Sequence, residues 1–207
     1  IGNVSWLKSL YSIHENNGND FTSKHYRRLA YDEILANLLV LSQVRKRIKK
    51  YKKNKKSFDN KLSDKLIKNI NFKLTNNQIK IIEEINNDLM SETKMFRLIQ
   101  GDVGSGKTVV AFLAMIRAVE CQLQAALMAP TEVLVLQHYK TLKPWGEYIG
   151  VNIEILTGKD NKAHRKNVLD GLINGDISII IGTHALLQDD VHFKDLGLAV
   201  IDEQHRF

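Results

Sequence analysis

Residues 101–108 read GDVGSGKT, a glycine followed after four residues by glycine, lysine and threonine. The short segment Phe96–Gln100 before them, with apolar residues at 96, 98 and 99, predicts a strand, and the residues from Gly106 onward predict a helix. Glycines let a backbone wrap closely around a phosphate chain, and the start of a helix presents N–H groups and a positive dipole. The stretch therefore predicts a phosphate-binding loop, with a flexible glycine-serine turn as the alternative.

Each residue of this loop has an expected part in the site. Backbone N–H groups would cradle phosphates, Lys107 would reach the terminal ones, and the Thr108 hydroxyl would ligate magnesium. The predicted nucleotide-contacting residues are Gly101, Asp102, Val103, Gly104, Ser105, Gly106, Lys107 and Thr108.

After Leu74, short apolar runs alternate with segments of helical periodicity. Such alternation is typical of crossover units that join parallel strands. It predicts an α/β fold with a parallel sheet covered by helices on both faces. The predicted helices are 75–89, 106 onward, 131–142 and 164–173, and the predicted strands are 96–100, 125–129, 151–156, 177–181 and 198–201.

The last predicted strand, Leu198–Ile201, runs into two carboxylates, Asp202 and Glu203. The carboxyl ends of parallel strands form the sheet edge where ligands of open α/β sheets bind, and the loop at 101–108 belongs to the same edge. Asp202 would hold magnesium through water, while Glu203 would orient and deprotonate an attacking water. An ordinary acidic turn is the alternative.

The N-terminal part has a different character. Residues 27–51 carry apolar side chains at spacings of three and four, which predicts an amphipathic helix whose stripe packs on the following domain. Residues 45–56 hold nine Lys or Arg and no acid, so they are either a solvated run or a contact with nucleic-acid phosphates. Residues 52–71 read as a linker. We therefore divide the chain into a helical extension with a basic linker at 1–60 and a second domain at 61–207.

Composition narrows the class of protein further. The formal net charge of +7 favours polyanionic partners. A single cysteine, Cys121, excludes an internal disulfide and favours a cytoplasmic protein. We find no leader pattern and no apolar run of the ~20 residues that a membrane span requires, so we expect a soluble chain with no membrane partner. Because Ile1 is not Met and Phe207 follows a charged motif directly, both ends look cut.

Several motifs in order resemble one family. Residues 202–205, DEQH, are similar to the DExH box of superfamily-two helicases, and GDVGSGKTVVA, MAPTEVL, QH, LTG, GTHALLQ and IDEQHRF are similar to motifs of RecG-type helicases. The resemblance covers residues 72–207. It implies a RecA-like ATP-binding lobe of an ATP-dependent DNA helicase that remodels branched DNA and stalled forks, with ATP and Mg²⁺ as cofactors. We assign no role to Gln137 and His138, the QH pair, because ordinary surface positions explain them equally well.

The resemblance also implies roles for other matching residues. Gln78 would recognise adenine, although Thr75 and Gln78 also have the spacing of a helix-capping box. Phe72 would lie against the base, with a core position as the alternative. Thr131 would hold a DNA phosphate at a helix N-terminus, unless it is a plain N-cap. The implied DNA-contacting residues are Thr131, Glu132, Thr157, Gly158, Thr183 and His184, and the residues implied to couple nucleotide to DNA are Gln204 and His205.

The expected activity of this chain depends on domains that RecG-type helicases have in addition to the ATP-binding lobe. RecG-type helicases hold ATP between two lobes, the second of which supplies arginines worth about 10³- to 10⁵-fold in rate. They also carry a wedge domain for branched DNA. We expect a monomer that needs both missing parts and hydrolyses ATP weakly or not at all by itself. The alternatives are a double-stranded DNA translocase of the transcription-repair coupling type and a non-catalytic remnant that binds nucleic acid.

Overall fold

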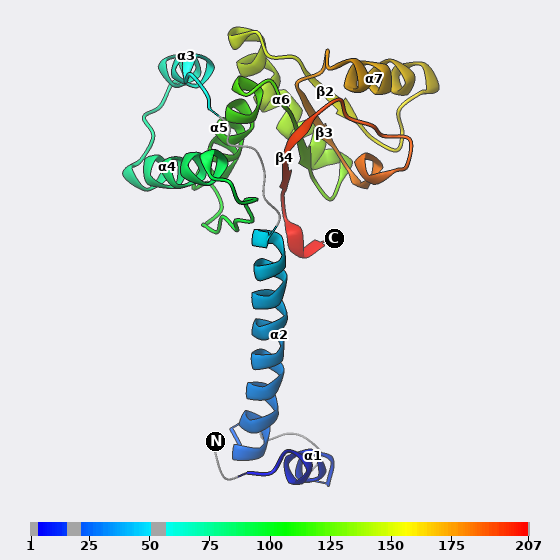
Figure 1. The fold of residues 1–207 in the computed structure, drawn as a ribbon. Helices are drawn as coiled ribbons and strands as arrows, with labels where there is room; N and C mark the ends of the chain where they lie inside the picture. The colour runs from blue at the N-terminus through cyan, green and yellow to red at the C-terminus, as the bar shows by residue number, and fades with distance from the viewer. Residues whose placement is uncertain (1–3, 16–21, 51–56, 207) are drawn as a thin grey trace. The chain divides into compact units, whose positions relative to one another are not determined.

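The computed structural model describes residues 4–15, 22–50 and 57–206. Contacts divide the chain into two compact units, residues 1–53 with 92–96 and residues 54–91 with 97–207. Figure 1 draws the helices and strands of both units. The domain boundary at residue 60 stays a prediction.

Among its described residues, the first unit contains two helices, α1 (Trp6–Glu15) and α2 (Lys24–Lys50). The helix predicted at residues 27–51 is therefore confirmed over its described length. Ser9 of α1 is buried, and its hydroxyl lies 3.4 Å from Nδ1 of His25 on α2. The apolar stripe of α2 is exposed, and its partner surface stays a prediction, as does a DNA contact of the basic run, whose residues 51–56 lie outside the described ranges. No helix in those ranges is long and apolar enough to cross a membrane.

The second unit contains a sheet of four parallel strands. They are β1 (Gln124–Met128), β2 (Ile153–Leu156), β3 (Ile179–Gly182) and β4 (Leu196–Ile201), in the order β2-β3-β1-β4. The central strands β1 and β3 are buried almost throughout, as expected of parallel strands covered on both faces. The predicted α/β fold with a parallel sheet is confirmed (Figure 1).

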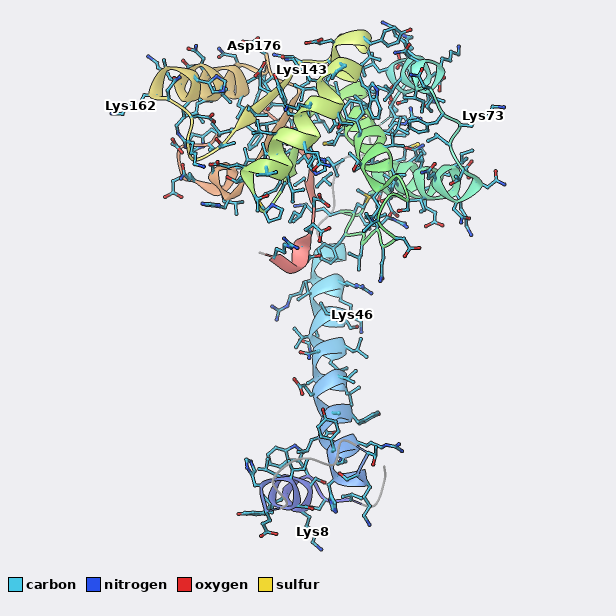
Figure 2. The ribbon with its side chains drawn as sticks, turned by 180° about the vertical axis from the view of Figure 1, so that it is seen from behind. Lys8, Lys46, Lys73, Lys143, Lys162 and Asp176 are labelled. Atoms are coloured by element: carbon cyan, nitrogen blue, oxygen red, sulfur yellow. The ribbon has the colours of Figure 1, made fainter. Side chains whose placement is uncertain are left out.

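Helices cover both faces of this sheet. α5 (Lys107–Glu120) and α6 (Glu132–Ile149) share one face, where the rings of Phe112 and Trp145 lie 5.8 Å apart and Gly146 packs closely on Ile153. α7 (Lys162–Asn174) covers the other face, with Val168 and Leu172 in one buried cluster with strand residues Ala126, Leu156 and Ile180. Strand side chains alternate between faces, so Ile153 and Leu156 of β2 belong to opposite layers. Figure 2 labels Lys143 of α6, whose ammonium donates to the carbonyl of Ile153 at 2.8 Å, where β2 begins.

The strand predicted at Phe96–Gln100 is wrong, because that segment has no regular secondary structure and Leu98 is exposed. The guanidinium of Arg97 binds Asp88 at 2.7 Å and Glu84 at 2.6 Å, both on α4 (Asn76–Met90). These ion pairs hold the segment beside α4, whereas a strand requires a hydrogen-bonded neighbour along its length. β4 is consequently an edge strand of the described sheet.

The linker predicted at 52–71 is wrong over residues 61–69, which form α3 (Lys61–Asn69). Oε1 of the buried Glu120, on α5, accepts from the N–H groups of Leu62 and Ser63 at 2.9 and 3.0 Å and from the Ser63 hydroxyl at 3.1 Å. Its other oxygen accepts from Arg117 at 2.9 Å. α3 is thus anchored by a polar contact to a distant part of the chain, which local composition does not reveal.

The other helices start close to their predicted positions, but α6 continues beyond the predicted end at Leu142. It passes Pro144 and ends before Gly150, whose φ of 80° gives a left-handed cap. A proline inside a helix removes one hydrogen bond at a cost of about 3 kcal/mol. Burial of Leu142, Gly146 and Ile149 offsets this cost and keeps the helix intact.

Candidate functional site at the carboxyl edge of the sheet

The direction of the chain brings the phosphate loop and Asp202 to one edge of the sheet. β4 runs parallel to β1, and the N–H of Asp202 extends their ladder by donating to the carbonyl of Met128 at 2.9 Å. α5 leads into β1 through a short turn and packs along it in the opposite direction, so Lys107 at its start lies toward the carboxyl end of β1. Figure 1 shows β4 running toward η2 (Gln204–Arg206) at this edge.

Two glycines shape the phosphate loop. Gly104 and Gly106 have φ angles of 80° and 81°, in the left-handed region that other residues rarely adopt. The N–H of Ser105, between them, donates to the carbonyl of Asp102 at 3.2 Å and closes a tight turn. A Cβ atom on Gly106 would push aside Nε2 at the end of the Gln78 side chain, but it is the positive φ that makes this position unsuitable for other residues.

Lys107 lies against its own loop. Its Nζ donates to the carbonyls of Gly101 and Asp102 at 2.7 and 2.8 Å. Residues 101–105 are exposed, so a ligand has access to the loop. Thr108 follows in the first turn of α5. The predicted loop therefore has an ammonium and a hydroxyl at the start of one helix, next to backbone that phosphate oxygens can approach.

Gln78 connects α4 to the phosphate loop. Its Oε1 accepts from the N–H of Thr75 at 2.9 Å, and its own N–H donates to the Thr75 hydroxyl at 3.3 Å, so the capping box is confirmed. Its Nε2 donates to the carbonyl of Ser105 at 2.9 Å. Each amide atom keeps a second bonding position, so adenine recognition stays a prediction compatible with these contacts. Phe72, the other predicted adenine contact, is half-exposed shortly before α4.

Both carboxylate oxygens of Asp202 are held. Oδ1 accepts from the N–H of Glu203 at 3.0 Å, and Oδ2 lies 2.8 Å from Nε2 of His138 on α6. The His138 side chain is 12% exposed and thus well enclosed. Sequence reasoning missed this residue, since its only signal was the family match of the QH pair. Glu203 is exposed with a φ of 51°, and its predicted neighbour in the box, His205, has a side chain outside the described part.

The candidate DNA contacts lie where β1, β2 and β3 end, at the same edge. The Thr131 hydroxyl caps α6 by accepting from the N–H of Leu134 at 3.3 Å. The Thr183 hydroxyl caps η1 (His184–Leu187) by accepting from the N–H of Ala185 at 3.4 Å. Both threonines therefore act as N-caps, and each hydroxyl keeps its hydrogen for a further acceptor.

A surface ion pair joins two of these segments. Lys159 binds Glu132 at 2.7 Å, and this hydrogen bond raises the pKa of Lys159. The N–H of Thr157 donates to the Asp160 carboxylate at 2.6 Å, and the Thr157 side chain is buried. Gly158, in contrast, is exposed, as is His184. Of the predicted DNA contacts, Thr157 and Thr183 are thus enclosed by protein, whereas Thr131, Gly158 and His184 are open to a ligand.

The oxygen donors at this edge fit a magnesium ion that is bound mainly through a ligand's phosphates. Magnesium is usually held in proteins by one or two carboxylates together with substrate phosphates and water. Within the described ranges, no group of three or more His, Cys, Asp or Glu could form a protein cage for a metal. The Thr108 hydroxyl and the Asp202 carboxylate are the ligand types that this arrangement requires.

A parallel α/β sheet with a glycine-rich loop and a carboxylate pair on one edge defines a P-loop nucleotide-binding domain. The family described as DEAD/DEAH box helicase matches residues 75–207, and the chain belongs to this family. Its sequence is similar to that of ATP-dependent DNA helicase RecG, with 45% identity over 185 residues for Thermotoga maritima and 44% over 204 residues for Aquifex aeolicus. These alignments cover 89% and 97% of this chain but 24% and 26% of the relatives, so the chain spans about a quarter of their length.

Solved structures agree with the fold. The structure described as RecG bound to a three-way DNA junction is 45% identical with a TM-score of 0.79, covering 89% of this chain and 25% of that one. A hypothetical ATP-dependent RNA helicase from Sulfolobus tokodaii, 19% identical with a TM-score of 0.54, covers 71% of this chain and 42% of that one and shares the fold alone. The RecA-like lobe and the resemblance to RecG-type helicases are confirmed.

Replacing Gln78 by Glu should separate its two contacts. The carboxylate still accepts from the N–H of Thr75, but it has no hydrogen to donate to Ser105. We therefore expect Q78E to keep its thermal midpoint while its affinity for a fluorescent nucleotide analogue falls about tenfold. This loss corresponds to one hydrogen bond between neutral groups together with repulsion between the new carboxylate and the Ser105 carbonyl. T75A is the matched control, because it removes the capping hydroxyl, worth about 0.5–2 kcal/mol, and leaves the Ser105 contact in place. Equal nucleotide affinities in Q78E and the unmodified chain would contradict the role of this contact.

Proposed function

We propose that this chain is the ATP-binding lobe of a RecG-type, ATP-dependent DNA helicase, which in the intact protein couples ATP hydrolysis to movement on branched or forked DNA. The observation that carries the proposal is the direction of the chain: α5 leads back along β1 and β4 runs parallel to β1, so the start of α5 with Lys107 and the end of β4 with Asp202 are directed to one edge of the sheet. A triphosphate bound along the loop extends toward a carboxylate pair at this edge. The three-way junction in the solved RecG structure supports branched DNA as the partner.

The residues of the edge have distinct roles in this proposal. Lys107 exchanges the carbonyls that it now contacts for the terminal phosphate oxygens of ATP. The Thr108 hydroxyl and, through water, Asp202 hold Mg²⁺, whose bound charge offsets that of the phosphates. Glu203 orients the attacking water and accepts its proton. Gln78 holds the loop against α4 and uses its second bonding positions for adenine, with Phe72 as a contact for the base.

DNA binds, in the same proposal, through its phosphate backbone at the exposed starts of helices. The N-terminus of α6 carries the positive end of a helix dipole. The Thr131 hydroxyl accepts from the helix and donates its own hydrogen to a phosphate oxygen. Glu132 is the first residue of α6, and Gly158 and His184 follow the ends of β2 and β3 at the same edge of the sheet. Contacts to the backbone carry no sequence information, which suits a motor that moves along any sequence.

Full activity requires parts of the protein beyond this lobe. The chain spans about a quarter of its relatives' length, and arginines from a second lobe contribute about 10³- to 10⁵-fold in nucleotide hydrolysis of this kind. We therefore infer that the lobe alone binds ATP and hydrolyses it weakly. Gln204 and His205, next to the carboxylate pair, would transmit the state of the nucleotide to the rest of the motor.

Lys107→Ala should abolish nucleotide binding by the chain. For the unmodified chain, Mg-ATP at a hundred times its Kd stabilises the fold by about 2.7 kcal/mol, which appears as a raised thermal midpoint. K107A should show no such rise, because the ammonium that reaches the phosphates is gone. K166A is the matched control on the exposed face of α7 and should respond like the unmodified chain. Equal stabilisation of K107A and K166A would identify the loop as an unused remnant.

Thr131→Asp should weaken DNA binding without unfolding α6. Aspartate is as good an N-cap as threonine, but its charge repels a phosphate. We expect about tenfold weaker binding of single-stranded DNA, measured by fluorescence anisotropy at low salt. N161D is the matched control, because Asn161 caps α7 by accepting from the N–H of His164 at 2.8 Å. The same DNA affinity in both variants would remove Thr131 from the DNA-binding surface.

A further inference from the structure

His138 of α6 contacts Asp202, a residue of the proposed nucleotide site, and the same helix begins at Thr131, a proposed DNA contact. Its Nε2 lies 2.8 Å from Oδ2 of Asp202. Thr131, the N-cap of the same helix, is seven residues earlier, which is two helical turns or about 10 Å along one face. α6 therefore connects a candidate phosphate contact, Thr131, to the carboxylate that would hold magnesium through water, Asp202.

The chemistry of the pair determines the direction of the hydrogen bond. An ionised carboxylate only accepts, so Nε2 of His138 carries the hydrogen and donates it to Oδ2. Oδ1 already accepts from the N–H of Glu203 at 3.0 Å. With one bond to each oxygen the plane of the Asp202 carboxylate is determined, and the remaining lone pairs stay available for a water on a metal ion.

The contact is not required to hold α6 on the sheet. Apolar side chains of α6, Leu142 and Ile149 among them, are buried, and the ring of Trp145 meets that of Phe112 of α5. Asp202 is 32% exposed, so the pair lies at the rim of the fold rather than in its core. The apolar packing of α6 does not involve this hydrogen bond, which is well placed to aim a carboxylate.

We propose that His138 is a positioning residue that aims Asp202 at the divalent cation of bound nucleotide and, through α6, links nucleotide binding to DNA binding at Thr131. This inference rests on the proposed function. Hydrogen-bond partners behind a metal ligand typically contribute about 10- to 100-fold in metal affinity. Linkage between two binding sites is reciprocal. If bound nucleotide changes the affinity for DNA through this contact, bound DNA changes the affinity for nucleotide by the same factor.

The test uses the 207-residue chain and a non-hydrolysable ATP analogue, whose affinity is measured in EDTA and in Mg²⁺. In H138A the gain in affinity due to Mg²⁺ should fall about tenfold or more, while the affinity in EDTA stays within about twofold. H138Q keeps an N–H donor and should recover part of the gain. Q137A, on the exposed neighbouring position of α6, should behave like the unmodified chain. The effect of the Mg²⁺-bound analogue on single-stranded DNA affinity should shrink in H138A in the same proportion.

The outcomes separate this inference from the proposed function. No gain from Mg²⁺ in the unmodified chain would overturn both. If H138A retains the full gain in analogue affinity from Mg²⁺, the role of His138 alone is overturned. The same holds if H138A loses analogue affinity equally in EDTA and in Mg²⁺, because such a loss indicates a general structural defect. If H138A fails to fold, the comparison is made with H138Q, whose thermal midpoint is measured in parallel. A gain in analogue affinity from Mg²⁺ that is full in Q137A and reduced in a folded H138Q supports the positioning role.

Discussion

The parallel ladder between β1 and β4 is the constraint on which the rest of the site depends. Because the N–H of Asp202 continues this ladder to the carbonyl of Met128, the carboxylate has to lie beside the end of β1. α5 runs back along β1, so Lys107 at its start belongs to the same end. Two motifs that are far apart in the sequence are thereby directed to the same edge of the sheet.

Helix starts at this edge serve folding and ligand binding at once. The first N–H groups of a helix need acceptors, and Thr75 with Gln78, Thr131 and Thr183 provide them. A hydroxyl or an amide that caps a helix retains another bonding position. The structural and functional explanations of Gln78 and Thr131, which the sequence leaves as alternatives, are therefore compatible in one molecule.

Much of the sheet could be predicted from the sequence, because buried parallel strands appear as continuous apolar runs such as Ile179–Ile181. The phosphate loop could be predicted from the spacing of its glycines, lysine and threonine, and Asp202 from its place after the strand β4. The strand expected at Phe96–Gln100 could not be ruled out in this way, since its apolar character gives no sign that Arg97 pairs with two carboxylates of α4. Local hydropathy describes burial and does not identify an ionic partner.

Contacts made over long sequence separations account for what else the sequence did not reveal. α3 lies in a polar segment that resembles a linker, and its anchor, Glu120, is 57 residues from Ser63. The contact between His138 and Asp202 spans 64 residues. Neither can be inferred from periodicity or composition, because both depend on how α5 and α6 cross the sheet. Such contacts lie between elements, at positions where the sequence of each element alone looks unremarkable.

The most direct test of the shared edge is a double-mutant cycle between Thr108 and Asp202, measured on the Mg²⁺-dependent affinity for a non-hydrolysable ATP analogue. If both side chains hold the same cation, T108A and D202N are coupled. The double variant then loses little more than the more severe single variant, with an interaction energy of about 0.5–3 kcal/mol. Losses that simply add would place the two groups at separate sites and contradict the account.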